Sequence, residues 1–195
     1  MTYIDFHAHH PSLAGERVVQ DGVDTCGRHP WHLTPLTSHP SPLTCPQGVL
    51  AIGESGLDKA CDTPYDLQLK VFREEVERSE QFRLPLFLHC VRAIDDVLRI
   101  RRELHARQPW IWHGYRGNAQ QLEQLLKLGA FYFSFGIRYN RQALLACPPD
   151  RLLLETDDNA QRPIADHYAQ VARLRNTPLD ELVRQMHTNF QTLFG

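Results

Sequence analysis

Short apolar runs alternate with longer amphipathic stretches along most of this chain. The runs are rich in β-branched and aromatic residues, as strands are, and the stretches between them have the length and spacing of helices. This alternation is typical of βα units around a parallel sheet. The expected strands cover residues 2–6, 23–26, 49–53, 85–88, 109–112, 130–135 and 151–154. The expected helices cover residues 64–82, 92–107, 118–128, 139–146, 163–174 and 178–193.

The chain length limits how these elements can be arranged. With 195 residues, the chain is long enough for one domain with a full hydrophobic core. We therefore expect residues 1–195 to form a single domain. Alternating strands and helices predict a compact TIM-like (β/α) barrel, small for an architecture that typically uses about 250 residues. An open, doubly wound sheet is the competing architecture.

The N-terminal region departs from the alternation. Residues 10–22 are too short for a crossover helix followed by a strand. Asp21-Gly22 between valine-rich flanks is typical of a two-residue hairpin turn, so we expect an antiparallel hairpin at residues 17–26 in place of one βα unit. The proline-rich residues 33–48 are expected to form a surface loop with at most a short helix.

Charge, cysteine content and hydropathy narrow the class of protein. The formal net charge of -2 gives no general attraction to polyanions, so a nucleic-acid substrate would have to be held by a local patch or by bound metal. The five cysteines include no Cys-x-x-Cys pair, which indicates reduced thiols and argues against a zinc finger. Met1 is followed by no apolar signal region, and no apolar run approaches 18 residues. We therefore expect a cytoplasmic protein without a membrane partner.

Several of the 11 histidines stand at the ends of expected strands. His7 and His9 are two residues apart, so an extended backbone points both side chains to one side. A lone histidine at a strand end is more often a hydrogen-bonded core residue than a ligand, but here the pattern recurs. Four histidines and two carboxylates end expected strands: His7, His9, Glu54, His89, His113 and Asp157. This set predicts two divalent cations that share a bridging carboxylate.

Such a ligand set has a defined chemistry. Mixed nitrogen and oxygen donors suit Zn, Mn, Fe, Co or Ni, whereas Mg fits the histidine-rich position less well. A pair of these ions lowers the pKa of a bound water and stabilises the oxyanion that forms when the water attacks. The residues alone therefore predict a metal-dependent hydrolase.

An ordered series of motifs carries a resemblance to a known family. The motifs are Asp5-x-His7-x-His9, Gly27-Arg28-His29-Pro30-Trp31, Ala51-Ile52-Gly53-Glu54-Ser55-Gly56-Leu57-Asp58, Leu84-Pro85-x-x-x-His89, His113-Gly114-Tyr115-Arg116-Gly117, Tyr132-Phe133-Ser134-Phe135-Gly136 and Leu154-Glu155-Thr156-Asp157. In this order the chain resembles the TatD-type metal-dependent hydrolases over nearly its whole length.

The resemblance implies a TIM-like barrel of the amidohydrolase type. It also implies phosphodiester hydrolysis by a metal-activated water, generally as a deoxyribonuclease acting on DNA ends. One metal would be held by His7, His9, Glu54 and Asp157, and Glu54 would bridge to a second metal held by His89 and His113. Asp157 is expected to orient the water or accept its proton, and Glu54 to hold the metals together.

The resemblance also suggests where substrate is held. His29 matches the family's glycine-x-histidine-proline loop and is expected to meet the substrate. Arg92 and Arg116 follow strand-end histidines and are expected to bind phosphate oxygens as guanidinium forks, with an ordinary ion pair as an equal alternative for both. The expected partner is therefore DNA or another phosphoester, and no obligate protein partner is expected.

Two departures from the family pattern keep other functions open. The helix and strand that usually follow the first histidine pair are missing, and the loop after Asp157 is short. The alternative is a two-metal barrel hydrolase of a small amide, lactone or phosphoester. A third hypothesis is a metal-binding subunit that has lost catalysis, against which the intact ligand set argues.

Overall fold

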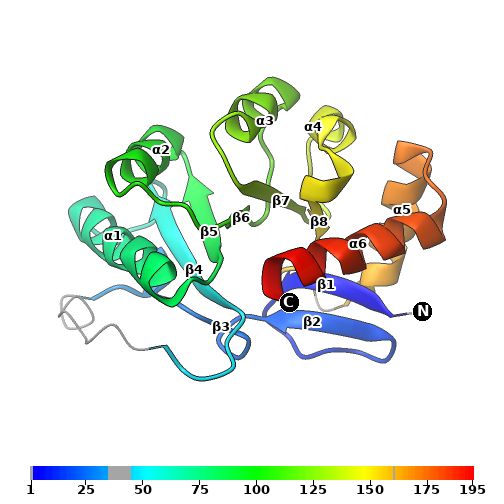
Figure 1. Cartoon of the computed structure of the whole chain (residues 1–195), viewed down its shortest axis with the longest axis horizontal. Helices are drawn as coiled ribbons and strands as arrows, with labels where there is room; N and C mark the ends of the chain where they lie inside the picture. Colours follow the sequence, from blue (N-terminus) through cyan, green and yellow to red (C-terminus); the bar gives the residue numbers. More distant parts are fainter. Residues whose placement is uncertain (1, 35–44, 160) are drawn as a thin grey trace. The chain divides into compact units, whose positions relative to one another are not determined.

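The computed structural model describes residues 2–34, 45–159 and 161–195. The chain divides into two compact units, unit 1 with residues 1–21 and 111–195 and unit 2 with residues 22–110. Figure 1 colours the chain along its sequence, so that unit 2 runs from blue to green. Within each unit the strands pair in parallel and a helix follows most of them, which confirms the predicted α/β class. Of the expected proline-rich loop, residues 35–44 lie outside the described residues.

Unit 2 is built on a buried central strand. Every residue of β4 is buried, as expected for a parallel strand with both faces covered. Helix α1 packs on β4 and buries Val71, Phe72 and Val76 (Figure 1). The elements of unit 2 are β3 (Thr25–Cys26), η1 (Pro30–His32), β4 (Ala51–Asp58), α1 (Tyr65–Phe82), β5 (Leu86–Val91) and α2 (Ile94–Glu103), with β3, β4 and β5 paired in this order.

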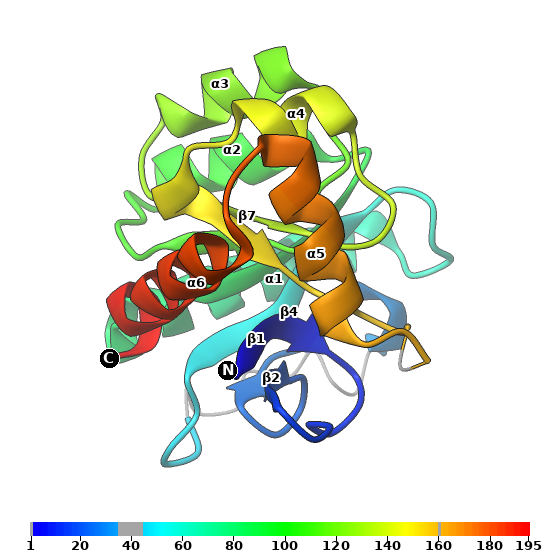
Figure 2. The same ribbon diagram turned by 90° about the vertical axis from the view of Figure 1, so that its right-hand side faces the viewer.

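Unit 1 combines the N-terminal strands with the C-terminal half of the chain. The last two helices, α5 and α6, pack on β1 (Figure 2), and the Tyr168 hydroxyl of α5 donates a hydrogen bond of 2.7 Å to the Ile4 carbonyl. Strands β7 and β8 pair in parallel. The elements of unit 1 are β1 (Tyr3–Ala8), β2 (Glu16–Gln20), α3 (Ala119–Leu126), β7 (Phe131–Phe135), α4 (Arg141–Ala146), η2 (Pro149–Arg151), β8 (Leu152–Leu154), α5 (Ile164–Arg175) and α6 (Leu179–Phe194). Strand β6 (Trp110–Trp112) crosses the boundary between the units in the sequence.

The expected hairpin at residues 17–26 is wrong. Strand β2 pairs in parallel with β1, and β3 pairs in parallel with β4. A turn does form after Asp21, with Gly22 at a positive φ of 74°. However, the Asp21 N–H bonds to the Ala8 carbonyl, so β2 stays registered on β1 as it enters the turn. The missing βα unit is thus replaced by a short connection, residues 9–15, between two parallel strands.

Strands β4 and β5 continue beyond their predicted ends. Glu54 and His89 therefore lie inside strands and not after them, because the parallel pairing of β4 with β5 continues to Asp58 and Val91. The register of β4 on β5 shifts between Ile52 and Ser55, which places Glu54 at a bulge. The register of β1 on β2 shifts between Asp5 and Ala8, which does the same for His7. Bulges re-aim side chains, and they are common beside active sites.

Two further expectations concern the whole chain. All five cysteines are free thiols in the structure. Among the described residues, no helix has both the length and the apolar character needed to cross a membrane.

Candidate metal centre

Unit 1 brings three predicted ligands together. His7 is fully buried, whereas the His9 side chain is 40% exposed. Asp157 Oδ1 lies 3.8 Å from His7 Nε2 and 3.5 Å from His9 Nε2. One donor atom from each of these side chains lies within 4.8 Å of the others. Donors bound to one ion at about 2.0–2.2 Å are separated by this kind of distance, so the three side chains fit a divalent cation.

The backbone fixes Asp157 beside β1. The Asp157 N–H donates to the His7 carbonyl at 3.0 Å, and the His9 N–H donates to the Asp157 carbonyl at 3.4 Å. Asp157 has a φ of 55°, in the left-handed region that aspartate tolerates better than most residues. Residues 150 positions apart in the chain are therefore joined by main-chain hydrogen bonds at the ligand set.

Asp5 also connects β1 to the segment that carries Asp157. The Asp5 carboxylate is fully buried and accepts hydrogen bonds from the backbone N–H groups of His7 (3.3 Å) and Thr156 (3.0 Å). The Thr156 hydroxyl also donates to Asp5 and lies 2.9 Å from His10 Nε2. Burial raises the pKa of Asp5 to about 7 even though the bonds from Thr156 oppose the shift. Asp5 thus holds together the two chain segments that carry His7 and Asp157.

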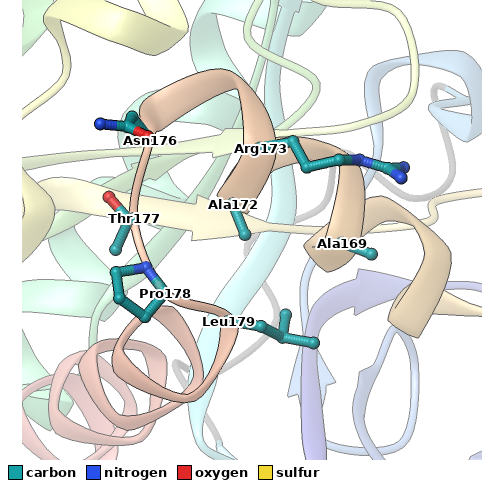
Figure 3. A pocket seen from close by; sticks show the side chains of 7 residues that line it. All are labelled: Ala169, Ala172, Arg173, Asn176, Thr177, Pro178 and Leu179. Atoms are coloured by element: carbon teal, nitrogen blue, oxygen red, sulfur yellow. The ribbon is translucent and has the colours of Figure 1, made fainter.

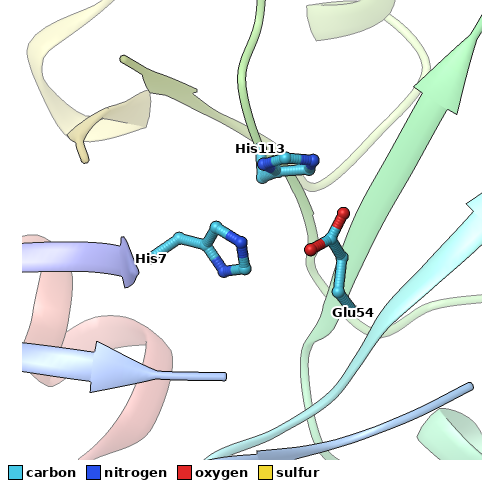
Figure 4. Close-up of side chains that lie close together, drawn as sticks. All are labelled: His7, Glu54 and His113. Atoms are coloured by element: carbon cyan, nitrogen blue, oxygen red, sulfur yellow. The ribbon is translucent and has the colours of Figure 1, made fainter. Parts of the chain in front are cut away.

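His113 is the fourth predicted ligand in unit 1. It directly follows β6, and its ring centroid lies 4.7 Å from that of His7; Figure 4 shows both side chains. His113 Nδ1 lies 3.6 Å from Oε1 of the fully buried Glu155, and this oxygen also accepts the Gly114 N–H at 2.6 Å. Burial first, and the charge of Glu155 second, raise the pKa of Asp157 above its ordinary value. The negative charge gathered here favours a bound cation.

Unit 2 brings Glu54, His89 and His29 together. His89 Nδ1 lies 2.7 Å from Glu54 Oε1, and His29 Nε2 lies 3.1 Å from the same oxygen. His29 Nδ1 accepts the Trp31 backbone N–H at 3.2 Å. Because a ring nitrogen that accepts cannot carry the proton, the proton of His29 is on Nε2. His29 therefore presents an N–H donor to this cluster, whereas Glu54 and His89 offer metal-ligating atoms.

A buried carboxylate lies behind His89. His89 Nε2 is 3.2 Å from Asp58 Oδ2, which also accepts the Trp31 indole N–H at 2.7 Å, and Oδ1 accepts the Ala60 N–H at 2.7 Å. Burial opposes ionisation of Asp58, but these donors outweigh it and lower its pKa. A histidine that binds metal through one nitrogen usually donates the other N–H to such a partner. His89 is therefore oriented with Nδ1 towards Glu54.

Two glycines let the His29 segment approach β4. A Cβ atom at Gly27 would lie 2.4 Å from the Gly53 Cα, closer than any side chain permits. Gly53 has a φ of 128°, which L-residues with side chains rarely adopt. Arg28 then ties the segment to α1 through Glu75 at 2.6 Å and Glu74 at 2.8 Å. His29 reaches Glu54 because these backbones are in contact.

Both predicted phosphate-binding arginines are exposed. Arg92 directly follows β5 with a φ of 54°, and Arg116 lies after His113 and before α3. Neither forms an ion pair with any residue that the structure describes. Both side chains are exposed, and their contact with phosphate stays a prediction.

Sequence reasoning missed the residues that support the ligands. The motifs that contain the predicted ligands also contain these supporting residues, and this proximity was the one sequence signal for them. They are Asp5, Asp58, Glu155 and Thr156. Their partners depend on contacts between segments far apart in the chain, which spacing alone does not reveal.

A separate cavity of about 510 Å³ lies where α5 turns into α6, lined by residues that include Arg173, Asn176 and Leu179 (Figure 3). Its lining includes none of the predicted site residues.

Comparisons with known proteins identify the family. The family model described as TatD related DNase matches residues 5–195. The chain is 30% identical over 173 residues to a Bacillus subtilis protein named uncharacterized metal-dependent hydrolase YabD, covering 78% of this chain and 68% of that protein. It is 30% identical over 209 residues to an Erwinia amylovora protein named 3'-5' ssDNA/RNA exonuclease TatD, covering 88% of this chain and 77% of that protein.

A solved structure shows the same fold. The crystal structure of YjjV, a TatD homologue from Escherichia coli K12, superposes with a TM-score of 0.75 at 24% identity, covering 94% of this chain and 78% of that one. The fold, the motifs and the match over residues 5–195 lead to one conclusion: this chain belongs to the TatD-related DNase family.

Proposed function

We propose that this protein is a divalent-metal-dependent phosphodiesterase that hydrolyses nucleic-acid ends. The observation that carries the proposal is the cluster of His7, His9 and Asp157, which two distant parts of the chain contribute to one place. Family membership supports the same chemistry, and the Erwinia amylovora relative is named as an exonuclease of single-stranded DNA and RNA.

The donor atoms of both units suit divalent ions, with His7, His9 and Asp157 as ligands in unit 1 and Glu54 with His89 in unit 2. When bound, such ions supply Lewis-acid chemistry, lowering the pKa of water and stabilising negative charge on a phosphoryl oxygen. That Glu54 bridges two ions, with His113 as a ligand of the second, stays a prediction. Zn, Mn, Co and Ni match the mixed donors best.

Side chains of the protein carry out proton transfer and phosphate binding. Asp157 orients the attacking water and accepts its proton. Burial raises its pKa, which makes its carboxylate a stronger base. His29 offers its Nε2 proton to a phosphoryl oxygen, because its Nδ1 is already occupied by the Trp31 N–H. Arg92 and Arg116, exposed and without ion pairs to described residues, hold phosphate groups of the substrate.

The experiment incubates the full-length protein with end-labelled single-stranded oligonucleotides and with a panel of chromogenic esters and lactones. Each reaction is run with Mn²⁺, Zn²⁺, Co²⁺, Ni²⁺ or Mg²⁺ and with a chelator. Stepwise shortening of oligonucleotides from a free end, lost in chelator and recovered with metal, is the expected result. Rapid hydrolysis of lactones or small esters with intact oligonucleotides would refute the proposal and favour the small-molecule alternative.

A further inference from the structure

Trp31 places an aromatic surface in solvent at the edge of the unit 2 cluster. Its side chain is 57% exposed, whereas Trp110 and Trp112, the other two tryptophans, are buried. Its ring centroid lies 4.9 Å from that of His29 and 5.6 Å from that of His89, in both cases edge to face. A large apolar ring therefore borders the side chains that face Glu54.

This exposed ring is also held in one orientation. The indole N–H donates to Asp58 Oδ2 at 2.7 Å, and Asp58 is itself 3% exposed and fixed by the Ala60 N–H. The Trp31 backbone N–H donates to His29 Nδ1, and the ring of Pro30, directly before Trp31, fixes the φ of that residue. An aromatic side chain fixed in advance loses little conformational entropy when a ligand covers it.

The chemistry of the surroundings indicates what would cover this ring. The proposed substrate brings a phosphoester to the metal-ligating atoms of Glu54 and His89. To cover Trp31 as well, it needs a flat, unsaturated group attached to that phosphoester. A nucleotide has this form, and any base can stack on an indole because every base has a π-face. A small aliphatic ester or lactone offers no such group.

We propose that Trp31 is a substrate-binding residue that stacks on an unpaired base of the nucleotide whose phosphodiester bond is hydrolysed. The inference rests on the proposed function, because it takes the substrate of the metal cluster to be a nucleic-acid strand. It adds the means by which a base is distinguished from a bare sugar-phosphate chain. Asp58 then has two tasks, since the same oxygen anchors Trp31 and faces His89.

Binding tests the proposal without catalysis. Full-length, metal-stripped protein is titrated with single-stranded oligothymidine and with an abasic oligomer of the same length, while tryptophan fluorescence is recorded for wild type and the anisotropy of an end-labelled oligomer gives the affinity of every variant. Oligothymidine should quench the emission, since Trp31 is the exposed tryptophan, and the abasic oligomer should not. Trp31→Ala should weaken oligothymidine binding about 5- to 150-fold, the usual effect of removing one base-aromatic stack, and leave abasic binding unchanged.

Two further variants test whether the aromatic face of Trp31 is what binds the base. Trp31→Phe keeps an aromatic face without the N–H anchor and should restore most of the affinity. Leu128→Ala removes an apolar side chain of unit 1 that is 51% exposed, close to the value for Trp31, and should bind like wild type. Equal affinities of wild type and Trp31→Ala for oligothymidine, or equal binding of both oligomers by wild type, would overturn the assignment.

Turnover separates this inference from the proposed function. With metal, wild type should remove a base-bearing terminal nucleotide with a higher kcat/KM than an abasic one, and Trp31→Ala should lose the difference. Cleavage of both ends at equal rates by wild type would overturn the role of Trp31 while leaving the phosphodiesterase intact. Base-dependent binding without cleavage of any oligonucleotide would instead overturn the phosphodiesterase and leave Trp31 as a base-binding residue.

Discussion

Replacing Asp58 with asparagine tests whether this carboxylate orients His89. The substitution keeps the shape of the side chain but removes its charge and one of its two acceptor oxygens. Asp58 Oδ2 accepts from Trp31 at 2.7 Å and faces His89 Nε2 at 3.2 Å, and Oδ1 accepts from Ala60 at 2.7 Å. The asparagine oxygen can keep the contacts with Trp31 and His89 only if it takes the place of Oδ2. Its NH₂ group then faces the Ala60 N–H, and the hydrogen bond from Ala60 is lost.

The expected magnitude follows from this rearrangement. One hydrogen bond to a charged acceptor is lost, and two others become bonds to a neutral amide. Bonds to charged groups contribute about 1.5–3 kcal/mol each and neutral ones about 1 kcal/mol. Losing the first bond should therefore cost about 1.5–3 kcal/mol, weakening the other two about 0.5–2 kcal/mol each, and the free energy of unfolding should fall by about 2.5–7 kcal/mol. Loss of a carboxylate behind a metal-binding histidine typically lowers metal affinity about 10- to 100-fold, and we expect this range for the unit 2 cluster.

Unfolding in urea gives the first quantity, and titration of Zn²⁺ or Mn²⁺ against a competing chromogenic chelator gives the second. Asp62→Asn is the matched control, because Asp62 is exposed in the same segment between β4 and α1. The control should match wild type in both measurements. Metal affinity of Asp58→Asn equal to that of Asp62→Asn, in a folded protein, would refute the orienting role.

Three further predictions concern the proton acceptor, the phosphate contacts and the pH dependence of stability. Asp157→Asn should retain most of its metal and lose about 10²- to 10⁴-fold in rate, measured by elemental analysis and single-turnover cleavage; an unchanged rate would rule out a proton acceptor at this position. Arg92→Gln and Arg116→Gln should each reduce the slope of log affinity for single-stranded DNA against log salt by about 0.7, and an unchanged slope would exclude a phosphate contact. Asp5 has a folded-state pKa of about 7, above its ordinary 3.8, so its contribution to stability is complete below pH 4 and is lost as the pH rises to 7. In metal-stripped protein the unfolding free energy should fall by up to about 4 kcal/mol across that window, and Asp5→Asn should remove this dependence; an equal slope in both proteins, from urea denaturation at several pH values, would contradict it.

The regular part of the fold follows from local sequence. Helices α1 and α6 lie within one residue of their predicted bounds, since Pro64 and Pro178 mark where each helix begins and the apolar spacing continues to the end. Strands β7 and β8 also lie within one residue of their predicted bounds, whereas β1 runs two residues past its predicted end and includes His7. Strand ends were harder to predict at β4 and β5, because the pairing that extends them to Asp58 and Val91 comes from the neighbouring strand.

The N-terminal connection shows where local signals mislead. Asp21-Gly22 does form a turn, and the flanking valines do form a strand. What the turn joins depends on the partners of β2 and β3, and these are β1 and β4. Local turn preference cannot distinguish a hairpin from a connection between strands that each pair elsewhere.

The sequence by itself determined which side chains are available for metal chemistry. The residue types that bind metals, and their positions after apolar runs, can be identified directly from the order of residues. His7, His9 and Asp157 could be named in advance for this reason, and the structure brings their donor atoms within 4.8 Å of one another. Only the tertiary structure decided how these ligands are supported. Asp5 bonding to Thr156, Glu155 facing His113 and Asp58 between Trp31 and His89 join residues up to 151 positions apart. Their partners are set by burial and hydrogen-bond satisfaction in the packed core, because a buried carboxylate must find donors wherever the fold provides them.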